Sequence, residues 1–435
     1  MATLQPSCNQ TLHSRIVLSL VIVCALLLAP KPASAYSVLA HQAIVDAVWD
    51  DAIVPLLRQR FPGTPADRIA AARAYAYGGS VIQDLGYFPF GSKRFTNLVH
   101  YVRSGDFVEA LIREATSAEE YAFALGALAH YACDNFGHPL AVNRAVPLHY
   151  PKLRARFGDS VIYAESPAQH VMVEFAFDVL QLAGAGYASQ ASQAYRDRIG
   201  FEVAKPVLER AFHATYGLTL QEVFRDEDLA IGTYRRAIST IIPEISRLAW
   251  EDKEDEIRAR TPDITRNDFV FTLTREQYEE QFGRGYQKPG LLTRVIFFLV
   301  KIVPKVGPLK PLAFEPLTPE TERLFANSFT TARERYRTWL VGLTRGPVAV
   351  ANTDFDTGEP PTRSDNPLLE ETYADLLNVL AEKRFTVVPR ELAQEINRHY
   401  GTPRGTAALS GKQRKQDVKA RRVLAAMNAS TPAAE

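Results

Sequence analysis

Cysteine is scarce in this chain of 435 residues, and its placement limits how the fold is stabilised. Of the three cysteines, Cys8 and Cys24 lie within the first 35 residues, so only Cys133 remains in the rest of the chain. A single cysteine cannot form an intramolecular disulfide. Residues 36–435 must therefore be stabilised by packing or by bound metal.

Excess charge is lacking as well. The chain has 50 Lys and Arg against 49 Asp and Glu, and the net charge changes from +1 to −1 when residues 1–35, with two basic and no acidic residues, are removed. A nearly neutral chain has no general electrostatic attraction to polyanions, which argues against a nucleic-acid-binding protein. The chain is 46% hydrophobic and 23% charged, which is typical of a globular protein and excludes wholesale disorder.

The clearest long apolar run is N-terminal. "IVLSLVIVCALLLA" follows Arg15 and precedes the small-residue sequence Ala33-Ser34-Ala35. This order is typical of a secretory signal peptide over residues 1–35, cleaved between Ala35 and Tyr36. A retained transmembrane anchor is the weaker alternative, because the run is short for crossing a bilayer. We expect an exported protein, periplasmic or secreted, whose mature chain begins at Tyr36.

Strand-like alternation is also rare, with "FVFTLT" (269–274) as its clearest instance, and helical periodicity dominates. We predict an all-α fold: a large helical domain over residues 36–260 and a mostly helical C-terminal extension over 261–400. The last part, residues 401–435, is basic and rich in Ala, Ser and Thr, and we predict a disordered tail. The predicted helices are 38–60, 65–78, 106–136, 165–184, 201–215, 226–260, 319–343, 367–384 and 389–399.

Two segments of the C-terminal extension stand out. "NTDFDTGEPPTRSDNP" (352–367) is predicted to be a polar loop. "LLTRVIFFLVKIV" (291–303) places Arg294 and Lys301 on one face of an otherwise apolar helix. One interpretation is a helix that rests on a membrane surface. The favoured alternative is a helix packed into the domain, with the two cations reaching solvent.

The stretch "LAHYACDNFGHPL" (128–140) carries the strongest chemical signal. His130, Asp134 and His138 are spaced four residues apart, so a helix would place them on one face, and Pro139 would end that helix. Imidazole and carboxylate are ligands that zinc accepts. The pattern therefore favours a metal site over the alternative of polar residues satisfied inside a core.

Other candidate ligands lie before and after this stretch. In "SPAQHVMVEFAFDVL" (166–180), His170 and Glu174 are four residues apart on a helix that Ser166-Pro167 would begin. Asp84 lies in "GGSVIQDLGYFPF", His100 in "FTNLVHYV", and His41 five residues after Tyr36. Each motif alone is a weak signal, and their ordered combination is a stronger one.

Residues 36–180 with these motifs resemble the zinc-dependent phospholipase C family, whose relatives include fungal-type zinc nucleases that cut single-stranded nucleic acid. The family has an all-helical domain with three zinc ions and uses the first residue of the mature chain as a ligand. The resemblance implies one zinc held by the amino group and carbonyl of Tyr36, by His41 and by Asp134. It implies a second held by Asp84, His100, His130 and a bridging Asp134, and a third held by His138, His170 and Glu174.

The sequence departs from the family pattern in two places. The family's first mature residue is usually tryptophan, whereas here it is tyrosine, and only its main-chain atoms are needed. The family's next histidine commonly follows the bridging aspartate by six residues, whereas His138 follows Asp134 by four. His149 is therefore an alternative ligand of the third zinc.

The resemblance and the composition together predict a function. We expect phosphodiester hydrolysis, with Asp84 orienting or deprotonating the attacking water. A phospholipid substrate is favoured over nucleic acid, because the charge is near zero and the related nucleases contain disulfides. The alternatives are a zinc-dependent single-strand nuclease and a non-catalytic, zinc-stabilised protein that binds lipid or a partner.

Overall fold

A computed structural model describes residues 38–88, 90–182, 201–236, 317–363, 366–402 and 411–430, with a few single positions between 247 and 266. Three predictions fall outside these residues: the mature N-terminus at Tyr36, the strand-like segment 269–274 and the amphipathic segment 291–303. The predicted boundary at residue 260 also lies where only single positions are described.

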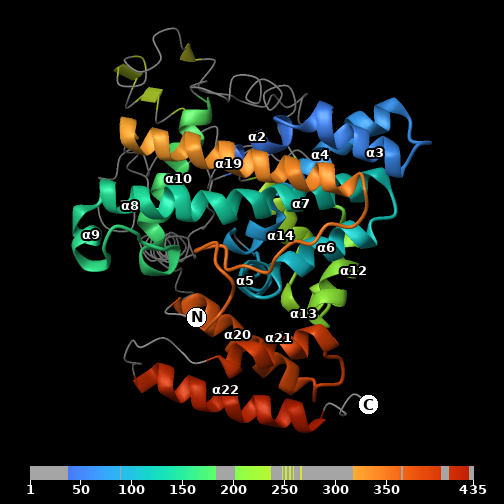
Figure 1. Ribbon diagram of the computed structural model, residues 1–435, viewed down its shortest axis with the longest axis vertical. Coiled ribbons are helices and arrows are strands. Elements are labelled where there is room, and N and C mark those ends of the chain that lie inside the picture. The colour runs from blue at the N-terminus through green and yellow to red at the C-terminus, as the bar shows by residue number, and fades with distance from the viewer. Residues whose placement is uncertain are drawn as a thin grey trace, which may run out of the picture.

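The described part of the chain is built from helices, which confirms the predicted all-α class. In Figure 1 the helices cross one another around the central helix α7. The α-helices are α2 (Val38–Asp46), α3 (Val54–Arg60), α4 (Ala66–Ile82), α5 (Lys93–Tyr101), α6 (Ser104–Glu114), α7 (Ala118–Gly137), α8 (Asn143–His149), α9 (Pro151–Phe157), α10 (Pro167–Leu182), α12 (Lys205–Tyr216), α13 (Leu220–Val223), α14 (Glu227–Arg236), α19 (Pro319–Leu343), α20 (Pro367–Glu382), α21 (Arg390–Gly401) and α22 (Gly411–Ser430). Short helical turns are η1 (Trp49–Ile53), η2 (Gln83–Tyr87), η3 (His138–Val142) and η4 (Tyr163–Glu165).

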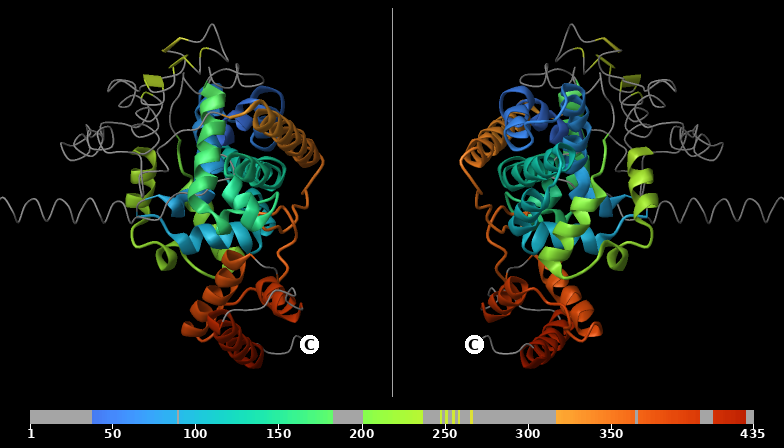
Figure 2. Two further views of the ribbon diagram at one scale, coloured as in Figure 1. Left: turned by 90° about the vertical axis from the view of Figure 1, so that its left-hand side faces the viewer. Right: turned by 90° about the vertical axis from the view of Figure 1, so that its right-hand side faces the viewer.

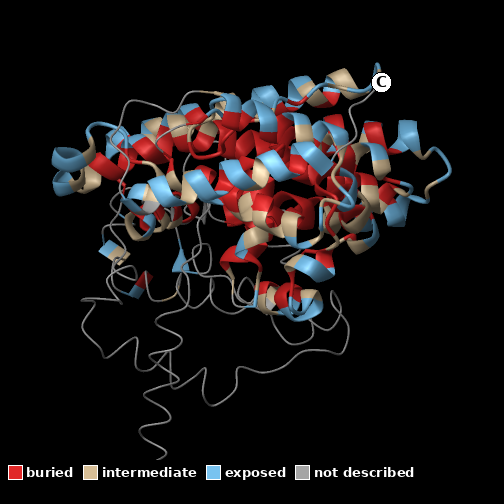
Figure 3. Ribbon diagram, turned by 90° about the horizontal axis from the view of Figure 1, so that it is seen from below, coloured by how far each residue is buried: buried red, intermediate tan, exposed pale blue. Residues whose placement is uncertain are grey.

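Helix α7 is at the centre because nearly all of its side chains are apolar or small and buried. It packs against α4, α6, α2 and α19, and the last of these runs alongside it although it follows almost 200 residues later (Figure 1). Buried residues concentrate where the helices face one another, and exposed residues lie on their outer faces (Figure 3). Helix α19 is thus part of the main core, with bounds as predicted.

Glycine brings α4 and α7 into backbone contact. A Cβ atom added at Gly79 would lie 1.8 Å from the carbonyl oxygen of Phe123, and one at Gly126 would lie 2.0 Å from that of Ala76. Any side chain at these positions would force the helices apart, since real Cβ contacts are never this short. The close crossing places the end of α4 beside the middle of α7.

Two of the predicted helices are interrupted. The predicted helix 106–136 is divided into α6 and α7, because the Ser117 side chain accepts a hydrogen bond from the Glu120 amide and begins a new helix there. The predicted helix 38–60 is divided into α2, the π-helical turn η1 and α3, with Pro55 in the first turn of α3. Apolar periodicity continues across both breaks, which is why the pattern alone did not reveal them.

The prediction that Pro139 ends the helix after His138 is wrong. The chain continues from α7 through the π-helical turn η3 directly into α8. Pro139 occupies the first turn of η3 and removes one backbone N–H from the helical ladder, and the wider π-helical turn accommodates it. The wider turn changes the direction in which His138 points relative to Asp134.

The prediction of a disordered tail from residue 401 is wrong over residues 411–430, which form α22. Helices α20, α21 and α22 lie together at one end of the molecule (Figure 2). Ala420 and Met427 of α22 are buried, and Asp417 pairs with the buried Arg363, which also pairs with Glu370. The basic composition concealed an apolar stripe with helical spacing. Among the described helices, none is long and apolar enough to cross a membrane.

Candidate metal centre

Eight of the nine predicted ligand residues lie in the described chain, and all eight side chains are buried. None exposes more than 3% of its surface: His41, Asp84, His100, His130, Asp134, His138, His170 and Glu174. They come from α2, η2, α5, α7, η3 and α10. Burying this many ionisable groups is costly unless they are paired or hold metal ions, so their convergence requires an explanation.

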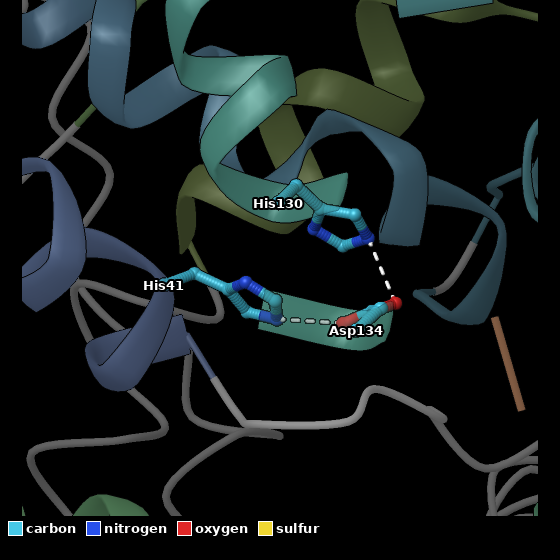
Figure 4. Close-up of side chains that lie close together, drawn as sticks. All are labelled: His41, His130 and Asp134. Carbon is cyan, nitrogen blue, oxygen red and sulfur yellow. Dashed lines mark ion pairs between the residues drawn. The ribbon is translucent and has the colours of Figure 1, made fainter. Parts of the chain in front are cut away.

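The first group consists of His41, His130 and Asp134. The two histidines use opposite oxygens of the same carboxylate, with His41 Nε2 lying 3.5 Å from Asp134 Oδ1 and His130 Nε2 lying 3.1 Å from Asp134 Oδ2. Figure 4 shows both rings directed at the Asp134 carboxylate, one from α2 and the other from α7. The helical spacing of four residues brings His130 and Asp134 together, as the sequence indicated.

Asp178 of α10 fixes the start of the helix that carries His41. Its two carboxylate oxygens accept hydrogen bonds of 3.0 Å from the backbone amides of Leu39 and Ala40. A carboxylate at a helix N-terminus satisfies amides that have no partner within the helix and interacts favourably with the helix dipole. Sequence analysis did not identify this role for Asp178, because nothing local links residues so far apart.

The second group consists of Asp84, His100 and His130; it shares His130 with the first group, and Asp134 lies beside both. His100 Nε2 lies 3.4 Å from Asp84 Oδ1 and 3.5 Å from Asp134 Oδ2. His130 Nε2 lies 4.0 Å from Asp84 Oδ1. Asp134 therefore stands between His41 on one side and His100 on the other, the position that a bridging ligand requires.

For two of the histidines, a backbone carbonyl determines which ring nitrogen faces the carboxylates of the candidate metal groups. His100 Nδ1 lies 2.8 Å from the carbonyl oxygen of Thr96, and His130 Nδ1 lies 3.0 Å from that of Ser80. A carbonyl oxygen only accepts, so each Nδ1 must carry the proton and donate. When the ring is neutral, each Nε2 then presents its lone pair to the carboxylate side, where a metal would bind.

The third group consists of His138, His170 and Glu174. His170 Nδ1 lies 2.7 Å from Glu174 Oε1, and His170 Nε2 lies 2.8 Å from Asn143 Oδ1. His149, the alternative ligand, lies elsewhere, with Nε2 3.3 Å from Thr321 Oγ1. The turn η3 therefore gives the third group His138 in preference to His149.

Taken together, the distances around Asp134 fit metal ligands better than hydrogen bonds. Tetrahedral zinc with ligand distances of about 2.0–2.2 Å separates neighbouring ligand atoms by roughly 3.3–3.6 Å. The N···O distances around Asp134 are 3.1, 3.5 and 3.5 Å, whereas charge-assisted hydrogen bonds are shorter, about 2.7–2.9 Å. Both Asp134 oxygens and the Nε2 atoms of His100 and His130 are buried without a hydrogen-bond partner among the described residues. The donor set is therefore one that fits zinc.

The metal-free site is electrostatically heterogeneous. Burial, reinforced by the nearby His130, lowers the pKa of His41 to about 4. Burial also opposes charging of His100 and His138, but the carboxylates of Asp134 and Asp84 raise the pKa of His100 to about 9, and those of Asp356 and Glu174 raise the pKa of His138 to about 10. Without metal, protons on some of these histidines compensate for the carboxylate charge.

One loop that sequence analysis did not connect with the site lies against it. Asp354, Phe355 and Asp356 belong to the segment predicted as a polar loop, yet all three are buried. The ring of Phe355 lies 5.0 Å from that of His100 and 6.0 Å from that of His130, and Asp356 Oδ1 lies 3.5 Å from His138 Nδ1. The sequence contained one indication of this, because an aromatic residue flanked by two aspartates is unusual for a solvated loop.

Two tyrosines lie against the histidines on another side. Tyr87 makes an edge-to-face contact with His100 at 6.0 Å between ring centroids, and Tyr163 makes one with His170 at 5.8 Å. The two tyrosine rings are 6.0 Å apart. Both tyrosine side chains are buried, with exposures of 7% and 8%, and they pack against the histidine rings.

Comparison with known proteins gives one match. The sequence model of the family described as "Zinc dependent phospholipase C" matches residues 40–226. No curated protein and no solved structure matches significantly. The matched segment contains the eight described candidate ligands and ends before the loop that carries Phe355.

Proposed function

Because residues 40–226 match the model of the zinc-dependent phospholipase C family, we propose that this protein hydrolyses a phosphodiester bond of phospholipids at a centre of three zinc ions. The family is one of hydrolases, and the described residues include groups that could hold metal. The observation that carries the proposal is the shared carboxylate of Asp134, whose two oxygens face His41 on one side and His100 and His130 on the other.

The proposed ligand sets follow the three groups. His41 and Asp134 would hold one zinc with the main chain of Tyr36, while Asp84, His100, His130 and Asp134 would hold the second. His138, His170 and Glu174 would hold the third. When bound, zinc polarises phosphate oxygens and lowers the pKa of a coordinated water to about 7. The Nδ1 donors to Thr96 and Ser80 keep the rings of His100 and His130 in one orientation.

Asp84 is the proposed catalytic residue. Its carboxylate is 3% exposed, and Oδ1 faces His100. A carboxylate that ligates through one oxygen retains the second, which can orient the attacking water and accept its proton. Tyr87 and Tyr163 lie beside the second and third groups, where their rings pack against His100 and His170.

Export belongs to the same proposal. Cleavage after Ala35 would give Tyr36 a free amino group, only two residues before the start of α2 at Val38. Two residues span at most about 7 Å, and Asp178 fixes the first turn of that helix. Under this proposal the free amino group of Tyr36 would be a ligand of the zinc beside His41.

One observation favours the non-catalytic alternative, in which zinc is structural. The described ligand side chains are all buried, and Phe355 covers the rings of two of them. A structural site fills its positions with protein, whereas a catalytic site must expose one to substrate. Under the catalytic proposal, part of the covering chain moves when substrate binds.

The test uses protein that begins at Tyr36, purified with zinc. Hydrolysis of phosphatidylcholine vesicles is compared with cleavage of single-stranded DNA and RNA under the same conditions, with Asp84→Asn as the matched inactive variant. We expect phospholipid hydrolysis to exceed nucleic-acid cleavage and to be lost in the variant. Preferential cleavage of nucleic acid would support the nuclease, and zinc binding without either activity would support the structural role.

A further inference from the structure

The histidines of the metal centre follow a common arrangement. One ring nitrogen of His100, His130 and His170 faces a fixed acceptor: the carbonyl of Thr96, the carbonyl of Ser80 and the side-chain oxygen of Asn143, respectively. The other nitrogen faces carboxylates of the groups. Histidines that bind metal generally donate their second nitrogen in this way, which fixes the tautomer and the ring orientation.

For His138, the acceptor that faces Nδ1 is a carboxylate in the loop that follows α19. His138 Nδ1 lies 3.5 Å from Asp356 Oδ1, and both side chains are buried. A movement of about 0.5 Å would bring the two atoms to hydrogen-bond length. The His138 backbone belongs to η3, whereas Asp356 lies far beyond the segment that matches the family.

Asp356 is held so that Oδ1 remains directed at His138. Its Oδ2 accepts hydrogen bonds from Tyr101 Oη at 3.1 Å and from Asn366 Nδ2 at 3.3 Å. Its backbone amide donates to Asp354 Oδ1 at 2.9 Å. A carboxylate that is held by two donors on a fixed backbone loses little further entropy when it accepts a hydrogen bond from a neighbouring imidazole.

Asn143 connects the same loop to the second histidine of the third group. Its Nδ2 donates to the carbonyl oxygen of Asp356 at 2.6 Å, and its Oδ1 lies 2.8 Å from His170 Nε2. Because that Oδ1 accepts from His170, Nδ1 of His170 is left facing Glu174. The loop thus supports both histidines of the third group, one directly and one through Asn143.

We infer that Asp356 is a positioning residue of the third metal site, accepting a hydrogen bond from the protonated Nδ1 of His138 so that Nε2 is left for the metal. This inference rests on the proposed zinc centre and extends it to a part of the chain outside the family match. A direct bond from Asp356 to metal is the competing arrangement. Among the described residues, however, the ligand atoms that lie within 4.8 Å of one another here belong to His138, His170 and Glu174, without Asp356.

The experiment measures metal binding without any substrate. Wild-type protein and the Asp356→Asn and Asp356→Ala variants are titrated with zinc in the presence of a competing chelator. We expect one zinc per chain to be bound about 10- to 100-fold more weakly in both variants, with the other zinc ions unaffected. Glu359→Gln is the matched control, since it makes the same carboxylate-to-amide change on an exposed side chain of the same loop, and its zinc affinities should stay within about threefold of wild type.

A second measurement needs no variant. In zinc-loaded wild-type protein labelled with ¹⁵N-histidine, long-range ¹H–¹⁵N spectra should show His138 protonated at Nδ1 and metal-bound at Nε2. Metal on Nδ1, or unchanged affinity of all zinc ions in both Asp356 variants, would overturn the inference. Wild-type protein that binds no zinc would overturn the proposed function as well, whereas zinc-binding wild type with unaffected variants would overturn this inference alone.

Discussion

The rings of His41 and His130 are stacked, with centroids 4.4 Å apart and planes inclined by 13°, although the two residues come from α2 and α7. Two imidazolium ions would repel each other at this distance. Burial and the proximity of His130 lower the pKa of His41 to about 4. His41 is therefore uncharged at neutral pH, and at most one ring of the stack carries a charge. The stack therefore holds His41 in the neutral form that a metal requires.

The shared carboxylate leads to the first prediction. Asp134→Asn should reduce bound zinc by more than one ion per chain and lower phosphodiesterase activity by about 100-fold or more, because one residue serves both the first and the second group. His170→Ala should remove one zinc only. Metal analysis of the dialysed proteins measures both effects. Full zinc content in Asp134→Asn would show that Asp134 does not bridge.

The position of the N-terminus gives a second prediction. Protein that begins at Tyr36 should bind one zinc more than protein with an additional Met before Tyr36, because only the former offers a free amine beside His41. Activity should fall with the lost zinc. Mass spectrometry establishes the N-terminus, and metal analysis compares the two forms. Equal zinc content and rates would mean that residues 36–37 are an ordinary terminus that tolerates extension.

The close crossing of α4 and α7 gives a third prediction. Gly126→Ala should lower the free energy of unfolding by about 1–3 kcal/mol, because the new Cβ would meet the Ala76 carbonyl at 2.0 Å. It should also weaken zinc binding, since α7, which carries His130, would move away from α4 and from Asp84 in the turn that follows α4. Urea denaturation and zinc titration measure the two effects.

The matched control for that substitution is Gly232→Ala in α14. A Cβ there meets nothing within 4 Å, so the same change should be neutral or should stabilise the protein by up to about 1 kcal/mol. If Gly126→Ala were as stable as Gly232→Ala, the two helices would have to be farther apart than the structure places them.

Protonation of the metal-free site gives a fourth prediction. The pKa values of about 9 for His100 and about 10 for His138 mean that both rings carry a second proton at pH 7.5 without metal. Zinc needs a free ring nitrogen, so binding should release these protons, and zinc affinity should rise with pH up to about 9–10. Calorimetric titrations in buffers of different ionisation enthalpy measure the release. Zinc binding with no proton release would contradict these pKa shifts.

Local patterns in the sequence predicted much of the site. His130 with Asp134 and His170 with Glu174 are helical neighbours, and such pairs can be recognised from spacing alone. The all-α class and the bounds of α19 were equally evident, because the apolar periodicity of these segments is strong. The helical α22 was missed because its basic composition suggested disorder.

The contacts that sequence analysis missed are long-range. Asn143 and Asp356 are 213 residues apart, and Asp178 caps a helix that begins 140 residues earlier, so no spacing rule connects them. The direction of His138 depends on a π-helical turn that accommodates Pro139, and a proline is normally a sign that a helix ends. Such features are set by tertiary packing, which outweighs local preference.

Phe355 covers two histidine rings of the metal centre, and this should limit the rate at which zinc dissociates. Phe355 is fully buried against His100 and His130, and its amide donates to the His100 carbonyl at 3.3 Å. A zinc ion that dissociates past this side of the rings can leave only when the loop that carries Phe355 opens. Loss of zinc by this route should then proceed at the frequency of loop opening, as amide exchange does in a locally opening protein. Above a certain chelator concentration, adding more chelator would leave the half-life of the metal centre unchanged.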